Sequence, residues 1–270
     1  MAEPDYDICD LLRVMERLRD PQRGCPWDLK QNFRSIVPST LEECYELADA
    51  IEQGDYPHLA EELGDVLFQV IFYAQLGAEQ HLFDFSDVVN GLVGKLLRRH
   101  PHVFANTEIE GVVNADIAAE EVNKQWESIK QTERVARAEH GLLADIPKAL
   151  PALPRAQKLQ NRAARVNFDW PETSDVLTRL DEELVELRLA MAADDPLQIE
   201  DELGDVLFIC VNLARHLKVD AETALRRASS KFETRFGIME KMAASEGTGL
   251  AALSGEALEQ LWQKAKKNGG

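Results

Sequence analysis

The sequence has no apolar run close to the roughly 20 residues that cross a membrane. Its first ten residues, MAEPDYDICD, are acidic and do not resemble a cleavable signal. Cysteine is scarce: there are four, none in a Cys-x-x-Cys pair, and we expect them to be reduced rather than in disulfides or a metal site. These absences predict a soluble, cytoplasmic protein without a membrane partner.

Basic residues are also few. The chain has 30 Lys and Arg against 48 Asp and Glu, which gives a formal net charge of −18. Nonspecific binding to a nucleic-acid polymer needs a basic surface, so we exclude a polymer as partner. A free nucleotide stays possible, provided that divalent cations lie between its phosphates and clustered carboxylates.

Alternating strand patterns with hairpin turns are missing, whereas helical periodicity is pronounced. Apolar residues recur at steps of three and four in two stretches, and the second stretch repeats the first. We therefore predict an all-α fold. The two stripes are Leu59, Leu63, Val66, Leu67, Val70, Ile71, Ala74 and Ile199, Leu203, Val206, Leu207, Cys210, Val211, Ala214.

The chain is an internal duplication. ELGDVLF occurs at 62–68 and again at 202–208, and LEECYEL at 41–47 corresponds to DEELVEL at 181–187, all at an offset of 140. Further along the offset becomes 136, which pairs Lys95 with Lys231, Arg99 with Arg235 and Trp126 with Trp262. We predict two tandem domains of four or five helices each, 1–140 and 141–270.

Capping and turn-forming residues indicate where the acidic helices begin and where the chain turns between them. Ser39 or Thr40 is expected to cap the first acidic helix. Residues 54–57 (Gly-Asp-Tyr-Pro) and 194–196 (Asp-Asp-Pro) are expected to be turns. Such short connections predict antiparallel neighbouring helices.

Each repeat carries Glu-x-x-Glu followed by Glu-x-x-Asp. Residues three apart share a helix face, so two antiparallel helices would bring four carboxylates together. Their repulsion requires a cation or raised pKa values, and an all-oxygen set suits Mg²⁺ or Mn²⁺. A solvated acidic face is the plainer reading, but repetition of the whole set favours a metal site. The sets are Glu43, Glu46, Glu62, Asp65 and Glu183, Glu186, Glu202, Asp205.

Other phosphate and hydrolase chemistries lack their motifs. No His follows Glu by three residues, as di-iron bundles require. There is no His-Asp pair, no Walker A motif and no Gly-x-Ser-x-Gly nucleophile elbow.

These residues resemble the all-α nucleoside triphosphate pyrophosphohydrolases, and most closely the tandem-domain MazG family. The resemblance rests on the duplicated acid motif and on RLRDPQRGCPWD (17–28), RRHPHVF (98–104) and VNFDW (166–170), and it covers nearly the whole chain. It implies a homodimer that hydrolyses NTPs and dNTPs to a nucleoside monophosphate and pyrophosphate with Mg²⁺, for which Mn²⁺ can substitute. Housecleaning of nucleotide pools is the implied role.

The resemblance also implies roles for individual residues. The metal ligands are Glu183, Glu186, Glu202 and Asp205, and a second set is Glu43, Glu46, Glu62 and Asp65. The catalytic residues are the four ligands of the second repeat together with Glu182. The nucleotide-lining residues are Arg179, Leu180, Asp181, Glu182, Glu183, Gln198, Ile199, Glu200, Asp201, Asp205, Lys231, Phe232, Glu233, Thr234, Arg235 and Trp262.

Several alternatives stay open at this level. Glu182 (or Glu42 in the first repeat) either accepts a proton from water or binds a second metal. The paired Lys and Arg residues either meet phosphates or are solvated, and Trp262 and Trp126 either stack on a base or lie in a core. Pro101 interrupts the basic helix of the first repeat only, so we favour the second repeat as the main catalytic centre. The rival function is a Mg²⁺–nucleotide-binding bundle without turnover.

Overall fold

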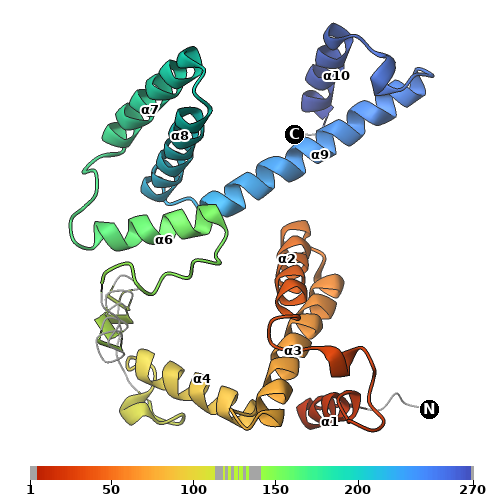
Figure 1. The fold of residues 1–270 in the computed structure, drawn as a ribbon, viewed down its shortest axis with the longest axis vertical. Helices are drawn as coiled ribbons and strands as arrows, with labels where there is room; N and C mark the ends of the chain where they lie inside the picture. Colours follow the sequence, from red (N-terminus) through yellow and green to blue (C-terminus); the bar gives the residue numbers. More distant parts are fainter. Residues whose placement is uncertain are drawn as a thin grey trace. The chain divides into compact units, whose positions relative to one another are not determined.

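The computed structural model describes residues 5–112 and 141–268, and residues 118, 121, 122, 125, 126, 128, 129, 132 and 133 between them. All regular elements within this part are helices (Figure 1), which confirms the all-α prediction. No helix in it is both long and apolar enough to cross a bilayer. The chain divides into two compact units, 1–133 and 134–270.

In the first unit, α1 (Ile8–Leu18) packs on α3 (Tyr56–Glu79), and α3 also pairs with α2 (Val37–Gln53) and contacts α4 (Phe85–Arg99). Asp7 caps α1 by accepting hydrogen bonds from the backbone of Cys9 and Asp10. The core is a cluster of Met15, Ile36, Ile71, Phe72 and Leu76. This cluster fixes α3, and α3 carries one side of the acidic set.

A buried arginine, Arg19, holds the RLRDPQRGCPWD segment (17–28) against α3. The Arg19 guanidinium donates to both carboxylate oxygens of Glu79, at 2.7 and 2.6 Å, and to the backbone oxygen of Asp28. It also lies 5.3 Å from the centre of the Phe72 ring. Arg19 thereby ties the loop after α1 to the end of α3. Its hydrogen bonds lower the pKa of Glu79.

The second unit contains α6 (Ala152–Ala164), α7 (Thr173–Ala193), α8 (Pro196–His216), α9 (Ala221–Ser245) and α10 (Gly255–Asn268). The helices α7 and α8 pack against each other, α6 packs on α8 and α9, and α9 packs on α10. The VNFDW segment is held to the end of α8 because Asp169 accepts hydrogen bonds from Arg215 and contacts His216.

Both acidic helix pairs turn as predicted. Gly54 ends α2 and Asp194 ends α7, each in the left-handed conformation, with φ of 70° and 53°. Asp55 and Asp195 then cap α3 and α8 by accepting backbone hydrogen bonds. Each hairpin therefore reverses within two residues, and Figure 1 shows the paired helices side by side.

One helix start was predicted wrongly. The helix α2 begins at Val37 after Ile36, and no side chain caps it, so neither Ser39 nor Thr40 is the cap. Pro38 occupies the first turn, where its missing N–H costs nothing, and the Thr40 hydroxyl donates back to the Ile36 carbonyl. The helix extends further towards the N-terminus than Ser39 and Thr40 suggested.

The apolar stripes are only partly buried. Ile71 and Ala74 lie in the core, but Leu63 is 52% exposed and its counterpart Leu203 is 47% exposed. Among the described residues, one apolar face of each acidic helix pair therefore stays exposed within its unit.

Candidate metal and nucleotide site

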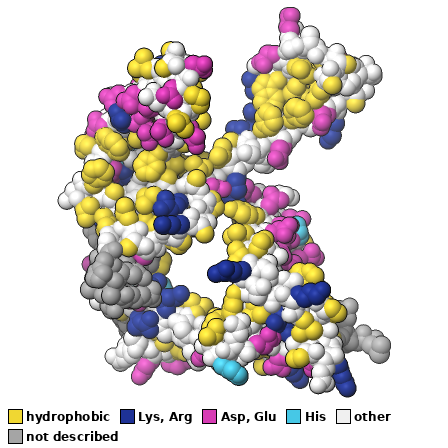
Figure 2. All heavy atoms as spheres, viewed as in Figure 1, with side chains coloured by type: hydrophobic (Ala, Val, Ile, Leu, Met, Phe, Trp, Pro, Cys, Tyr) yellow, Lys and Arg dark blue, Asp and Glu magenta, His cyan; other side chains and the backbone are white. Residues whose placement is uncertain are grey.

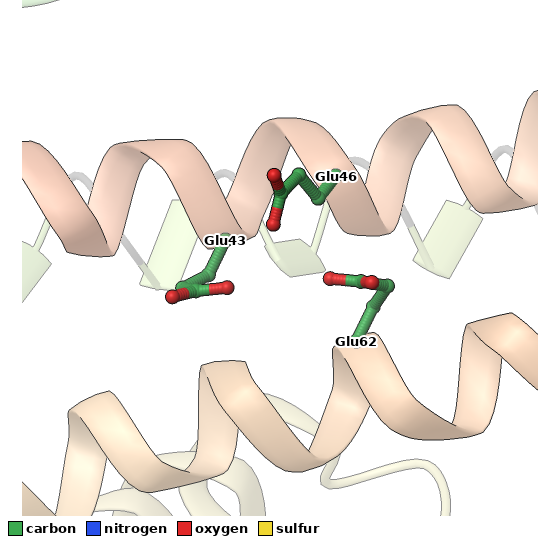
Figure 3. Close-up of side chains that lie close together, drawn as sticks. All are labelled: Glu43, Glu46 and Glu62. Atoms are coloured by element: carbon green, nitrogen blue, oxygen red, sulfur yellow. The ribbon is translucent and has the colours of Figure 1, made fainter.

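Each helix pair brings three glutamates together. In the first unit Glu43 and Glu46 project from α2 towards Glu62 of α3, and their carboxylates lie between the two helices (Figure 3). Ligand oxygens from all three lie within 4.8 Å of one another. The i, i+3 spacing on α2 places two acids on one face, and the short turn supplies the third from the facing helix.

The second unit repeats this arrangement. Glu183 and Glu186 of α7 meet Glu202 of α8, again with ligand oxygens within 4.8 Å of one another. Figure 2 shows acidic side chains gathered over α7 and α8. The predicted convergence of acids thus holds for three residues of each set.

The aspartates lie outside these groups. Asp65 and Asp205 are exposed, and neither contributes an oxygen to the 4.8 Å groups. Both are near enough to raise the pKa of a neighbouring glutamate, Glu43 in the first unit and Glu183 in the second. Their predicted role as fourth ligands remains a prediction.

One glutamate in each group is deeply buried. Glu62 is 6% and Glu183 is 4% exposed. Each has one carboxylate oxygen, Oε2, that is buried without a hydrogen-bond partner among the described residues, and the same is true of Glu202 Oε2. A buried acceptor of this kind is costly unless something binds it.

The electrostatics favour a positive ligand. Burial raises the pKa of Glu43, and Asp65, Glu46 and Glu62 raise it further. Burial also raises the pKa of Glu183; Arg179 opposes this shift, while Asp205 and the other glutamates add to it. Clustered carboxylates, unpaired buried oxygens and an all-oxygen donor set together fit a hard divalent cation such as Mg²⁺.

The other oxygen of each buried glutamate has a basic partner. Glu62 Oε1 lies 2.7 Å from Nε2 of His58, and Glu183 Oε1 lies 2.7 Å from Nη2 of Arg179. Arg179 was predicted to line the nucleotide, but sequence reasoning missed His58. Its spacing four residues before Glu62 on the same helix was the available signal.

The remaining predicted nucleotide residues lie on two separate parts of the second unit. Arg179, Leu180, Asp181 and Glu182 precede the acids on α7, and Gln198, Ile199, Glu200 and Asp201 form the start of α8. Residues 231–235 lie on α9, and Trp262 lies on α10.

The α9 residues form an aromatic cluster of their own. The ring of Phe232 lies 5.3 Å from that of Trp262 and 5.8 Å from that of Phe236. Phe232 is 54% exposed, and Figure 2 shows a hydrophobic patch over α9 and α10. Among the described residues, no ion pair joins Lys231 or Arg235 to the acids of α7 and α8. No ion pair of the described residues therefore links these two sets, and Figure 1 shows α10 apart from the α7–α8 hairpin of the same unit.

The basic residues of the two repeats differ as predicted. The helix α4 ends at Arg99, two residues before Pro101, whereas α9 continues without a break to Ser245. Arg99 donates to a carboxylate oxygen of Glu133. Trp126 lies 6.5 Å from the His100 ring. In the first unit the counterpart of Arg235 thus has a carboxylate partner from its own chain.

Comparison with known proteins gives the family. The MazG nucleotide pyrophosphohydrolase domain matches residues 31–104 and 172–237, which contain both acid clusters. A nucleoside triphosphate pyrophosphohydrolase of Escherichia coli is 48% identical over 95% of this chain and 96% of its own length. The nucleoside triphosphate pyrophosphohydrolase/pyrophosphatase MazG of Thermotoga maritima is 42% identical over 98% of both chains. The chain therefore belongs to the MazG nucleotide pyrophosphohydrolase family.

Proposed function

We propose that this protein hydrolyses nucleoside triphosphates, both NTPs and dNTPs, to nucleoside monophosphates and pyrophosphate, and that it uses Mg²⁺ to do so. The observation that carries the proposal is the pair of glutamate clusters with unpaired buried oxygens inside the two matched domains. The names of the relatives support the reaction. Removal of surplus or abnormal nucleotides is the role that this activity suits.

Glu183, Glu186 and Glu202 would hold the cation in the second repeat, with Asp205 as a further ligand after a change of side-chain rotamer. The cation supplies charge neutralisation at the phosphates and a more acidic bound water, and Mn²⁺ offers the same chemistry. Glu182, the exposed neighbour of Glu183 on α7, would accept a proton from water or bind a second cation.

The basic and aromatic residues would bind the substrate. Arg179 already contacts the acids, and Lys231 and Arg235 are one turn apart on α9, where they can meet phosphate oxygens. Trp262, packed on Phe232, offers a ring face to a base. Since one chain does not join these residues to the acids, we also propose that the protein works as a homodimer. The open apolar faces of both acidic helix pairs support a second copy.

The test is pyrophosphate release from a mixture of dNTPs, measured with Mg²⁺ and again with EDTA. We expect release only with the metal, and we expect Glu202→Gln to abolish most of it. Glu240→Gln, which makes the same change on an exposed site of α9, is the matched control. Absence of any metal-dependent release would leave a Mg²⁺–nucleotide-binding bundle as the function.

A further inference from the structure

The buried glutamate of each cluster has a basic partner at 2.7 Å, and the two partners lie on different helices. His58 contacts Glu62 from within α3, and Arg179 contacts Glu183 from within α7. Neither partner has a basic counterpart in the other repeat. At the 140-residue offset, Ser39 corresponds to Arg179, and Gln198 corresponds to His58. The two clusters thus share their acids but not their counter-ion.

Arg179 contacts more than the buried acid. Its Nη1 atom lies 2.9 Å from Glu182 Oε2 and 3.5 Å from Glu186 Oε1, while its Nη2 atom lies 2.7 Å from Glu183 Oε1. Two of these three glutamates belong to the metal group. A guanidinium keeps its charge at every pH at which proteins fold. In the second cluster a permanent positive charge therefore already occupies the ligands of the expected cation.

The first cluster has no such group. Ser39 is neutral, and among the described residues no ion pair joins Glu43 or Glu46 to a Lys or Arg side chain. Among the described residues, His58 on α3 supplies the basic contact to this cluster. A divalent cation that enters the first cluster therefore does not meet an arginine.

We propose that Arg179 makes metal binding in the second cluster depend on the triphosphate, whereas the first cluster binds the free metal. The inference rests on the proposed function. Without nucleotide, Arg179 competes with the cation for Glu183 and Glu186 and repels it. A bound triphosphate offers phosphate oxygens to the guanidinium, which is partly exposed. Metal and nucleotide then strengthen each other's binding by the same factor.

The test exchanges the residues that distinguish the clusters. Mn²⁺ binding to the full chain is followed from the electron paramagnetic resonance signal of free Mn²⁺. Glu62→Gln isolates the second cluster and Glu202→Gln isolates the first. Arg179→Ser and Ser39→Arg are then added in the respective backgrounds, and each places the other repeat's residue at the matched position. Every measurement is repeated with an α,β-methylene dNTP, which resists cleavage.

In the second cluster we expect the analogue to tighten Mn²⁺ binding about tenfold or more. Arg179→Ser should tighten binding of free Mn²⁺ by a similar factor and remove the effect of the analogue. Arg179→Lys keeps the charge and should behave like the unaltered cluster. In the first cluster, Ser39→Arg should weaken binding of free Mn²⁺, and circular dichroism melting checks that each variant folds.

Two outcomes overturn the inference by itself. One is that Arg179→Ser leaves the affinity of the second cluster for free Mn²⁺ unchanged. The other is that the analogue changes Mn²⁺ binding equally in both clusters. Either result counts against the inference alone when the unaltered protein releases pyrophosphate with Mg²⁺. Failure of both isolated clusters to bind Mn²⁺ would instead overturn the metal-dependent function together with the inference. If the Ser39→Arg variant does not fold, the comparison of Arg179→Ser with Arg179→Lys in the second cluster still tests the inference.

Discussion

The imidazole of His58 lies 2.7 Å from Oε1 of Glu62, one turn further along α3, and Oε2 of the same carboxylate is buried without a hydrogen-bond partner in the described part of the chain. His58 is about half exposed, whereas Glu62 is almost wholly buried. The pair therefore holds a buried acid in place from the solvent side and leaves its inner oxygen available.

His58→Ala should destabilise the first unit by about 1 kcal/mol in the absence of metal, because it removes the basic contact that the described residues give to a buried carboxylate. We expect Mg²⁺ to restore most of this loss, since the cation compensates the same charge. Thermal melting with EDTA and with Mg²⁺ measures both effects. Glu61→Ala, an exposed position on the same helix, is the control, and a loss that Mg²⁺ leaves untouched would contradict the prediction.

Equivalent ligands of the two repeats should differ in their effect on turnover. We expect Glu202→Gln to lower pyrophosphate release about 100-fold, and Glu62→Gln to lower it less than about threefold. The physical reason is that α9, which carries Lys231 and Arg235, is unbroken in the second unit, whereas α4 of the first unit ends just before Pro101. Steady-state rates for both single variants decide the matter. Equal losses would count against the second repeat as the main catalytic centre.

The metal-free protein should lose stability as pH rises above the ordinary carboxyl pKa of 4.5. The folded pKa values of Glu43 and Glu183 are raised, so between 4.5 and those values the folded state binds more protons than the unfolded state. Its stability falls as pH increases through this window. We expect Mg²⁺ to reverse the trend, because it binds the ionised carboxylates.

Melting temperatures from pH 4 to pH 8, with EDTA and with Mg²⁺, test this pH dependence. Glu183→Gln should flatten the metal-free curve and reduce the gain that Mg²⁺ provides. A gain from Mg²⁺ that stays constant over the whole pH range would refute the link between the clusters and the metal.

Glu79→Gln should lower the free energy of unfolding of the first unit by about 2 kcal/mol, because it leaves the buried Arg19 guanidinium without its carboxylate. The pKa of Glu79 is lowered in the folded state, so its contribution is present above 4.5 and is lost as pH falls below that value. Urea unfolding at pH 7 and at pH 4 measures this. A difference between variant and parent that is as large at pH 4 as at pH 7 would disprove it.

Much of the fold could be predicted from the sequence because it is set by local rules. Helical periodicity predicted α3 and α8, and Gly54 and the Asp-Asp-Pro stretch predicted the turns before them. The three-residue spacing of Glu43 and Glu46 predicted a shared face, and the duplication extended the same conclusion to the second repeat.

The rest depended on details that spacing does not contain. Whether Asp65 joins Glu62 depends on the rotation of α3 against α2 and on side-chain rotamers, which the pattern leaves free. Leu63 belongs to an apolar stripe, yet about half of its side chain is exposed among the described residues. Arg179 and His58 were not predicted as counter-ions, because a local pattern does not show which acid will be buried.

The reversals at Gly54 and Asp194 have a thermodynamic consequence. Because each hairpin turns within two residues, the glutamates of facing helices are brought together before any ion arrives. Binding of an ion then requires little ordering of the chain, so little of the binding free energy is lost to conformational entropy. Calorimetry of Mn²⁺ binding should accordingly show a heat-capacity change close to zero, the signature of a preorganised receptor rather than of folding coupled to binding.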